Sequence, residues 1–192
     1  MNSLLIERVI DGDEAAFKEL YDIYKEKVYR TAWMLTNNTN AAQDIIQEVF
    51  IQVYLKINRL KYLEAFESWL YKITVNCSLK HMKKYKTGTI IFDEDILNHT
   101  EETNTSFLPE SNVLEIELTK ELLNLVYSLP NEKKATIILY YYNNMSIKKI
   151  AEIMNCSEGT VKSRLFNSKK ILEEKINKSK KYNWEENIYG YW

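Results

Sequence analysis

Residues 146–172, SIKKIAEIMNCSEGTVKSRLFNSKKIL, contain two helical patterns separated by a short polar turn. Apolar residues recur at helical spacing in the first pattern. They are Ile147, Ile150, Ala151 and Met154. The residues NCS at 155–157 then break the pattern, because Asn and Ser favour turns and helix caps. This stretch therefore predicts two short helices joined by a tight turn.

Polar residues mark the start of both predicted helices. The hydroxyl of Ser146 is placed to cap the first helix, and Ser157 is placed to cap the second. Glu158 follows in the first turn of the second helix, where a negative charge is favourable. The inward side of the second helix is predicted from residues three or four apart: Val161, Leu165, Ser168 and Leu172.

The outward side of the second helix is basic and polar. It carries Thr160, Lys162, Ser163, Arg164, Asn167, Lys169 and Lys170. Between residues 162 and 181, eight Lys or Arg residues stand against two Glu. A solvated basic surface is one interpretation. The short first helix, the turn and the basic second helix together favour a helix-turn-helix that binds DNA in the major groove.

The composition predicts an all-α protein of two small helical domains. The 192 residues include only 4 Gly and 2 Pro, and most windows show helical periodicity. The net charge is −1, but residues 1–86 carry +2, residues 87–119 carry eight acidic and no basic residues, and residues 120–192 carry +5. We predict domains at 1–86 and 113–176, a flexible acidic linker at 87–112 and a basic, aromatic tail at 177–192.

The cysteines and histidines do not predict a metal site or a catalytic centre. Cys77 and Cys156 are far apart, and His81 and His99 have no neighbours with metal-ligand spacing. We expect reduced thiols, no cofactor and no small-molecule substrate. The sequence has no apolar run long enough to cross a bilayer and no signal-peptide pattern at its start, so we expect a cytoplasmic protein.

The first domain is predicted from three helical patterns, at residues 13–35, 41–57 and 66–84. In the second pattern one side is apolar and is expected to be buried. It consists of Ile45, Ile46, Val49, Phe50, Val53 and Tyr54. The other side carries Asp44, Gln47, Glu48 and Gln52. This polar side fits either plain solvent exposure or a basic partner helix, and by itself the pattern favours solvent exposure.

The third pattern combines aromatic and basic residues. Lys72, Lys80, Lys83 and Lys84 lie along it, and Tyr62, Phe66, Trp69 and Tyr71 stand at or before its start. Single-stranded nucleic acid binds to such combinations, because unstacked bases lie on aromatic rings and cations follow the backbone. A core of aromatic residues with solvated lysines is the alternative.

Four segments in order resemble the extracytoplasmic-function (ECF) sigma factors over most of residues 10–176. They are DEAAFKELYDIYKEKVYR, AAQDIIQEVFIQVY, FESWLYKITVN, and Leu129-Pro130 followed by IKKIAEIMNCSEGTVKSRL. The resemblance implies a transcription initiation factor that binds core RNA polymerase through the β′ clamp helices and the β flap. It also implies promoter DNA and an anti-sigma factor as partners.

The resemblance also implies roles for individual residues. Asp44, Gln47 and Glu48 would bind polymerase, so the resemblance reverses the solvent interpretation of that face. Phe66, Asn76, Lys80, Lys83 and Lys84 would bind the melted −10 strand. Thr160, Lys162, Ser163, Arg164, Asn167 and Lys169 would bind the −35 duplex. The chain departs from the family pattern at Lys80 and Lys149, where acidic residues are usual, and at 167–169, where Arg-Ala-Arg is usual.

Two other functions stay open at this point. A conventional dimeric helix-turn-helix regulator would bind an operator without polymerase, but it would leave Asp44, Gln47 and Glu48 unexplained. An enzyme with a catalytic helical bundle would need a nucleophile with a matched base, a metal cluster or a glycine-rich phosphate loop. The sequence offers none of these patterns.

Overall fold

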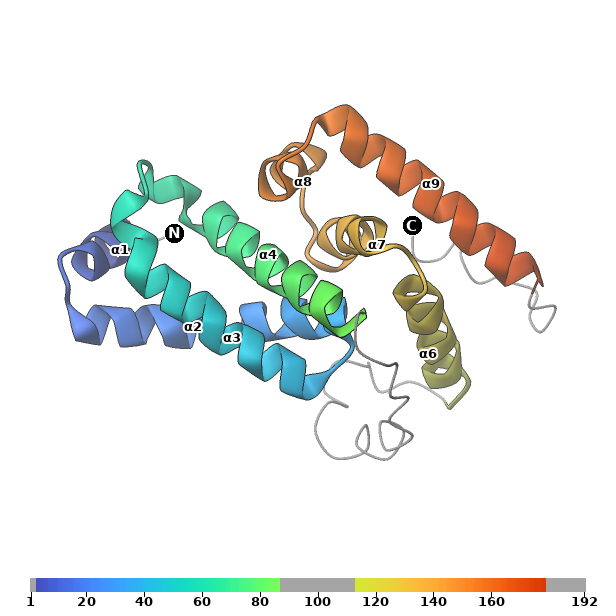
Figure 1. Ribbon diagram of the computed structural model, residues 1–192, viewed down its shortest axis with the longest axis horizontal. Helices are drawn as coiled ribbons and strands as arrows, with labels where there is room; N and C mark the ends of the chain where they lie inside the picture. Colours follow the sequence, from blue (N-terminus) through green and yellow to red (C-terminus); the bar gives the residue numbers. More distant parts are fainter. Residues whose placement is uncertain (1–2, 87–112, 179–192) are drawn as a thin grey trace.

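The computed structural model describes the backbone of residues 3–86 and 113–178 and the side chains of residues 3–84 and 120–177. The described backbone is helical and contains no strands. The first half is a small bundle. Its elements are α1 (Ser3–Ile10), α2 (Glu14–Thr36), α3 (Thr39–Lys56), the 3₁₀ turns η1 (Ile57–Arg59) and η2 (Leu63–Ala65), and α4 (Phe66–Lys86). Figure 1 shows α2, α3 and α4 side by side in this bundle. The all-α prediction is therefore confirmed.

The second half begins with α6 (Val113–Tyr127) and α7 (Asn131–Ile137), and α7 continues directly into the π-helix η4 (Ile138–Tyr142). The helices α8 (Ile147–Met154) and α9 (Glu158–Lys178) follow (Figure 1). The predicted linker and most of the predicted tail lie outside the described residues. The boundaries proposed from the sequence stay predictions.

Capping side chains fix the helix starts in the first half. Asp13 Oδ1 accepts a hydrogen bond from the Ala16 backbone N–H at 3.0 Å, and Asn38 Oδ1 accepts one from Ala41 at 2.8 Å. The preceding residue, Asn37, ends α2 in the left-handed conformation, with φ 52°. Asn adopts that conformation more readily than most residues, because its short side chain bonds locally. The predicted break between the first two helical patterns is confirmed, and only Asn37 and Asn38 lie between α2 and α3.

The start of the chain adds an element that the sequence analysis did not predict. The helix α1 buries Leu5, Ile6 and Val9 against the first bundle. Gly12 then has φ +87°, a backbone conformation that side chains disfavour, and this allows the sharp turn into α2. The apolar spacing of α1 extends over only two turns, which is too short for a firm helical pattern.

The helix-turn-helix forms as the sequence predicts. Ser146 Oγ accepts a hydrogen bond from the Lys149 N–H at 3.3 Å, and Ser157 Oγ accepts one from Thr160 at 3.1 Å. Asn155 ends α8 with φ 50°, in the left-handed conformation. The three-residue turn therefore aims α9 away from α8, as a helix-turn-helix requires.

Residues 131–142 form two kinds of helix in succession. The α-helix ends at Ile137 and the next five residues form a π-helix, in which the Asn143 N–H donates to the Ile138 carbonyl at 3.0 Å. Wider π turns are rare and often mark functional positions. Here the π turn ends at Asn143, whose side chain reaches Thr31 of α2.

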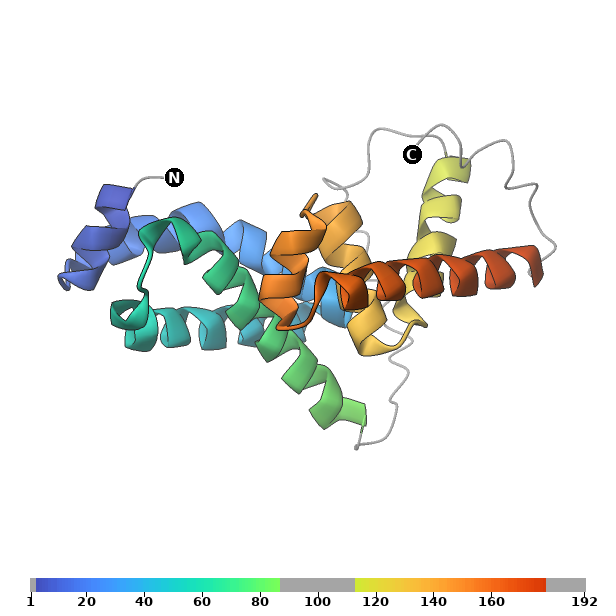
Figure 2. The same ribbon diagram turned by 90° about the horizontal axis from the view of Figure 1, so that it is seen from above.

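The two halves pack directly against each other. Figures 1 and 2 show α4 between the rest of the first bundle and the α7–α8 corner. Leu35, Tyr71 and Val75 of the first half belong to the same buried apolar cluster as the core of the second half. The described structure is thus two helical domains in contact, an arrangement that the sequence analysis did not predict.

Candidate functional site

The side of α3 that faces away from the bundle combines acidic, amide and apolar residues. Asp44 and Gln47 are exposed and Glu48 is half-buried. Ile51 and Leu55 continue the same stripe one and two turns later, and they are 59% and 67% exposed. We call these five residues the α3 surface. Exposed aliphatic side chains beside carboxylates suit a partner helix with basic and apolar groups.

Ile51 and Leu55 were not singled out from the sequence. The steps from Asp44 to Glu48, to Ile51 and to Leu55 are four, three and four residues, so helical spacing could have placed both on this side of α3. A related prediction was wrong: Tyr54 is 62% exposed rather than buried. Its ring contacts Phe17 edge to face, with 5.3 Å between the ring centres, at the margin of the core.

The helix α4 is buried on two opposite sides. Phe66, Leu70, Ile73 and Cys77 lie in the core of the first half. The opposite side carries Tyr71, Val75, Leu79 and Met82, which pack with the second half. At 100° per residue, only one strip between these sides stays open to solvent. We call the exposed residues there and at the end of α4 the α4 strip: Asn76, Lys80, Lys83 and Lys84.

Phe66 corrects the sequence prediction, because it does not lie on the surface. Its side chain is fully buried, and its ring packs against Tyr24 at 5.4 Å and Trp69 at 6.1 Å between ring centres. The first position of α4 points into the bundle, so Phe66 supports the core rather than offering a face to DNA. Tyr62, four residues earlier in the connector, is 70% exposed.

The α9 surface presents the predicted duplex-binding residues. Lys162, Ser163, Asn167 and Lys169 are exposed, and Thr160 and Arg164 are half-buried. The neighbouring Phe166 is 70% exposed on the same side. Phe166 was not predicted as a site residue from the sequence, although a large apolar residue among lysines indicates a binding surface.

Two residues at the edges of this surface are held by their own domain. Arg164 Nη1 lies 3.9 Å from the sulfur of Met154 and 3.8 Å from the sulfur of Cys156, at the turn after α8. The ammonium of Lys169 lies over the Tyr141 ring, 5.6 Å from its centre. A hydrogen bond with Tyr141 raises the pKa of Lys169, so the lysine stays charged. These contacts orient both cations before any ligand binds.

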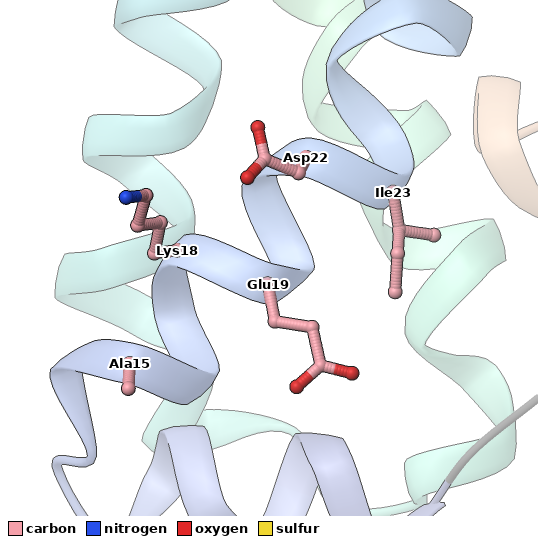
Figure 3. Close-up of a pocket in the computed structure, with 5 residues that line it drawn as sticks. All are labelled: Ala15, Lys18, Glu19, Asp22 and Ile23. Carbon is pink, nitrogen blue, oxygen red and sulfur yellow. The ribbon is translucent and has the colours of Figure 1, made fainter.

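An open hollow lies on α2, lined by Ala15, Lys18, Glu19, Asp22 and Ile23. Figure 3 shows that all five side chains come from one helix and point in different directions. A small-molecule site is usually a concave pocket with converging polar groups. This hollow is therefore a surface depression rather than a candidate binding site for a small molecule.

Within residues 3–84 and 120–177, no three His, Cys, Asp or Glu side chains are grouped to hold a metal ion. None of the helices in the described part of the chain is long and apolar enough to span a membrane. The predicted site residues other than Phe66 lie on the three surfaces of α3, α4 and α9.

Comparison with known proteins places both halves in one family. The model described as Sigma-70 region 2 matches residues 20–87, and the model described as Sigma-70, region 4 matches residues 119–172. The ECF RNA polymerase sigma-E factor of Haemophilus influenzae is 34% identical over 182 residues, covering 90% of this chain and 93% of that protein. The ECF RNA polymerase sigma factor SigW of Bacillus subtilis is 30% identical over 176 residues, covering 89% and 94%.

Solved structures share the fold. CnrH, in complex with the cytosolic domain of CnrY, aligns with a TM-score of 0.65 at 15% identity over 92% of this chain and 97% of that chain. RpoE from Bartonella quintana, in complex with the anti-sigma factor NepR, aligns with a TM-score of 0.61 at 18% identity over 84% and 96%. The match to both regions favours a sigma factor over a helix-turn-helix regulator that acts without polymerase. The chain belongs to the extracytoplasmic-function family of RNA polymerase sigma factors.

Proposed function

We propose that this sigma factor docks on core RNA polymerase through the α3 surface. The observation that carries this proposal is the stripe of Asp44, Glu48, Ile51 and Leu55. It exposes two aliphatic side chains next to two carboxylates without using them in the core. Burying Ile51 and Leu55 against a partner would supply about 1.5–3 kcal/mol each, and the carboxylates would select a basic helix.

Each of the two DNA-binding surfaces binds a different promoter element. The α4 strip binds the melted −10 strand with Asn76 and its lysines, and the exposed Tyr62 offers a ring for stacking. The α9 surface binds the −35 duplex in the major groove. There Arg164 can pair with guanine, and Phe166 can contact thymine methyl groups. The protein acts in the cytoplasm as an initiation factor, without a catalytic step of its own.

An anti-sigma factor is the regulatory partner in this proposal. RpoE of Bartonella quintana was solved in complex with the anti-sigma factor NepR, and its fold aligns with this chain. A regulator of the same class would act by covering the α3 surface or by holding the DNA-binding surfaces away from the promoter.

The test is capture of purified core RNA polymerase by the full chain. We expect the wild type to bind, and the double variant Asp44→Lys, Glu48→Lys to lose binding because it places two cations against a basic helix. The matched control is Glu7→Lys, Asp11→Lys, which reverses two exposed carboxylates at the same four-residue spacing on and after α1. Equal capture of both double variants and the wild type would contradict docking through α3.

A second experiment with the same two proteins identifies the promoter. Wild-type protein and core polymerase are incubated with genomic DNA fragments, and the fragments retained in heparin-resistant complexes are sequenced. A shared pair of motifs separated by a constant spacing is expected. Retention without any common motif would contradict promoter selection by this chain.

A further inference from the structure

The outward side of α9 carries a row of four exposed side chains, each about one helical turn from the next. We call them the α9 row: Lys162, Phe166, Lys170 and Glu174. Four residues rise about 6 Å along a helix, so the row is about 18 Å long and ends one turn before the end of α9. Phe166 is 70% exposed and stands between two lysines. An exposed ring between cations fits a partner that combines an aromatic ring with acidic groups.

The sequence that follows α9 carries the complementary pattern in reverse order. It reads SKKYNWEENIYGYW at residues 179–192, which lie outside the described residues. Every second residue from position 180 is in turn a cation, a ring, a ring and an anion: Lys180, Tyr182, Trp184 and Glu186. Taken backwards from Glu174, the α9 row is an anion, a cation, a ring and a cation. A segment that returns along α9 therefore meets a favourable partner at all four positions.

The intervals agree as well as the residue types. Two residues of extended chain advance about 7 Å, which is close to the rise of about 6 Å for four helical residues. Alternate side chains of an extended chain point to the same side, and residues four apart lie on the same side of a helix. The register therefore holds along the whole row, with the pairs Lys180 with Glu174, Tyr182 with Lys170, Trp184 with Phe166 and Glu186 with Lys162.

The aromatic pair is the strongest of the four. Opposite charges attract only weakly at an exposed surface, and a lysine over a tyrosine ring gains little there. Two aromatic rings also bury apolar area, so Trp184 on Phe166 supplies most of the binding. The segment is covalently joined to α9 and therefore meets the row at a high effective concentration.

We propose that residues 179–192 dock on the α9 row of their own chain, with Trp184 as the anchor, and compete there with duplex DNA. Trp184 covers Phe166, and Glu186 takes the place of a phosphate beside Lys162. A segment that is docked about four-fifths of the time raises the apparent Kd for duplex DNA about fivefold. The competition with DNA rests on the proposed function of α9, whereas the docking itself does not.

Disulfide trapping in the full chain tests the docking without DNA. Tyr182→Cys with Lys170→Cys joins two positions that face each other in the proposed register, and it leaves Trp184 and Phe166 in place. We expect an intramolecular disulfide to form on exposure to oxidised glutathione. Adding Trp184→Ala is expected to slow its formation about fivefold, because the docked fraction falls.

The trap needs a clean background and a matched control. All variants carry Cys156→Ser, because Cys156 is half-buried, whereas the other cysteine, Cys77, is buried. Trp192→Ala is the control, since it removes a tryptophan of the same segment that lies beyond the proposed register, and we expect it to leave the rate unchanged. Equal rates with and without Trp184→Ala would overturn the docking, and disulfide-linked dimers would assign the segment to a second copy of the chain.

Fluorescence anisotropy with a labelled duplex of random sequence tests the competition. Relative to the wild type, Trp184→Ala should lower the Kd about fivefold, and Trp192→Ala should not change it. The oxidised Tyr182→Cys, Lys170→Cys protein should bind more weakly than the same protein after reduction. An unchanged Kd for Trp184→Ala would overturn the competition even if the disulfide forms as expected.

The two measurements separate this inference from the proposed function. If neither the wild type nor Trp184→Ala binds duplex DNA, the assignment of α9 as a DNA-binding surface is wrong. Disulfide trapping then decides the docking alone. Tighter duplex binding by Trp184→Ala together with slower trapping would support both.

Discussion

The ammonium of Lys80 lies 3.3 Å from Oε1 of Glu48, so an ion pair joins α4 to α3 across the surface of the first domain. Glu48 belongs to the α3 surface and Lys80 belongs to the α4 strip. The side chains of Lys80 and Glu48 are 78% and 41% exposed, so the ion pair contributes under about 1 kcal/mol to the free energy of unfolding. Under the proposed function, polymerase docking on the α3 surface and single-strand binding on the α4 strip therefore compete for the same pair of charges.

Lys80→Met should separate these roles, because it keeps most of the side-chain stem and removes the charge. We expect the free energy of unfolding to change by less than about 1 kcal/mol. Affinity for core polymerase should rise by up to about fivefold, because Glu48 no longer has to leave Lys80. Binding to single-stranded DNA should become weaker and less dependent on salt.

Fluorescence titrations with core polymerase and with a single-stranded oligonucleotide provide both measurements for Lys80→Met. Lys61→Met, at an exposed position of the connector between η1 and η2, is the control for loss of a lysine. A fall in polymerase affinity for Lys80→Met alone would show that the ion pair prepares Glu48 for docking instead of competing with it.

Phe66→Ala should act on stability rather than directly on DNA binding. The side chain is fully buried against Tyr24 and Trp69, so we expect a loss of about 3–5 kcal/mol in the free energy of unfolding. Tyr62→Ala, at a position 70% exposed, should change stability by less than about 0.5 kcal/mol and weaken single-strand binding. Urea unfolding of both variants checks this contrast, and a stable Phe66→Ala variant would argue for a surface role.

The helix-turn-helix was the most predictable part of this fold, for local physical reasons. Ser146, Asn155 and Ser157 are capping and turn residues whose hydrogen bonds reach only three or four residues along the chain. The helix ends that they fix can therefore be predicted from the sequence. Phe66 was misplaced because aromatic residues suit both a core and a base-stacking surface, and only the direction of the first turn of α4 decides between them.

The contact between the two halves could not be predicted from the sequence. Tyr71 and Val75 are ordinary apolar residues on a helix, and nothing local shows that α4 buries two opposite sides. Lys149 was recognised as a departure from the family pattern, but its partner Glu67 is 82 residues away in the chain. Long-range pairing of this kind depends on how the domains meet. The placement of the site residues on α3, α4 and α9 followed from periodicity, while their roles remain proposals.

Lys162 and Arg164 should affect duplex binding in different ways. Lys162→Ala removes an exposed cation, so we expect weaker binding to all sequences and a salt slope smaller by about 1. Arg164→Ala should cost about 1–3 kcal/mol on the selected −35 duplex and much less on an unrelated duplex. Fluorescence anisotropy across a salt series measures both effects, with Lys18→Ala on the distant α2 as the control. Equal losses on both duplexes for Arg164→Ala would assign it to the phosphate backbone.

Cys77 gives the first domain a predictable response to alkaline pH. Burial, reinforced by the nearby negative charge of Glu48, raises the pKa of the Cys77 thiol to about 11. An unfolded thiol has a pKa of about 8.5, so the folded state holds this proton more tightly. The stabilisation is complete below about pH 8.5 and is lost as pH rises through the folded pKa.

We therefore expect the wild type to lose roughly 2–3 kcal/mol more stability than Cys77→Ala when the pH rises from 8 to 11. Tyrosines and lysines titrate over the same interval in both proteins, so the difference between the two isolates Cys77. Urea unfolding at several pH values gives this difference. Parallel pH profiles for the two proteins would show that the thiol ionises as easily in the folded protein as in the unfolded chain. The Nε2 atom of Gln52 lies 3.2 Å from the sulfur of Cys77. In that case Gln52 stabilises the thiolate enough to cancel the effect of burial.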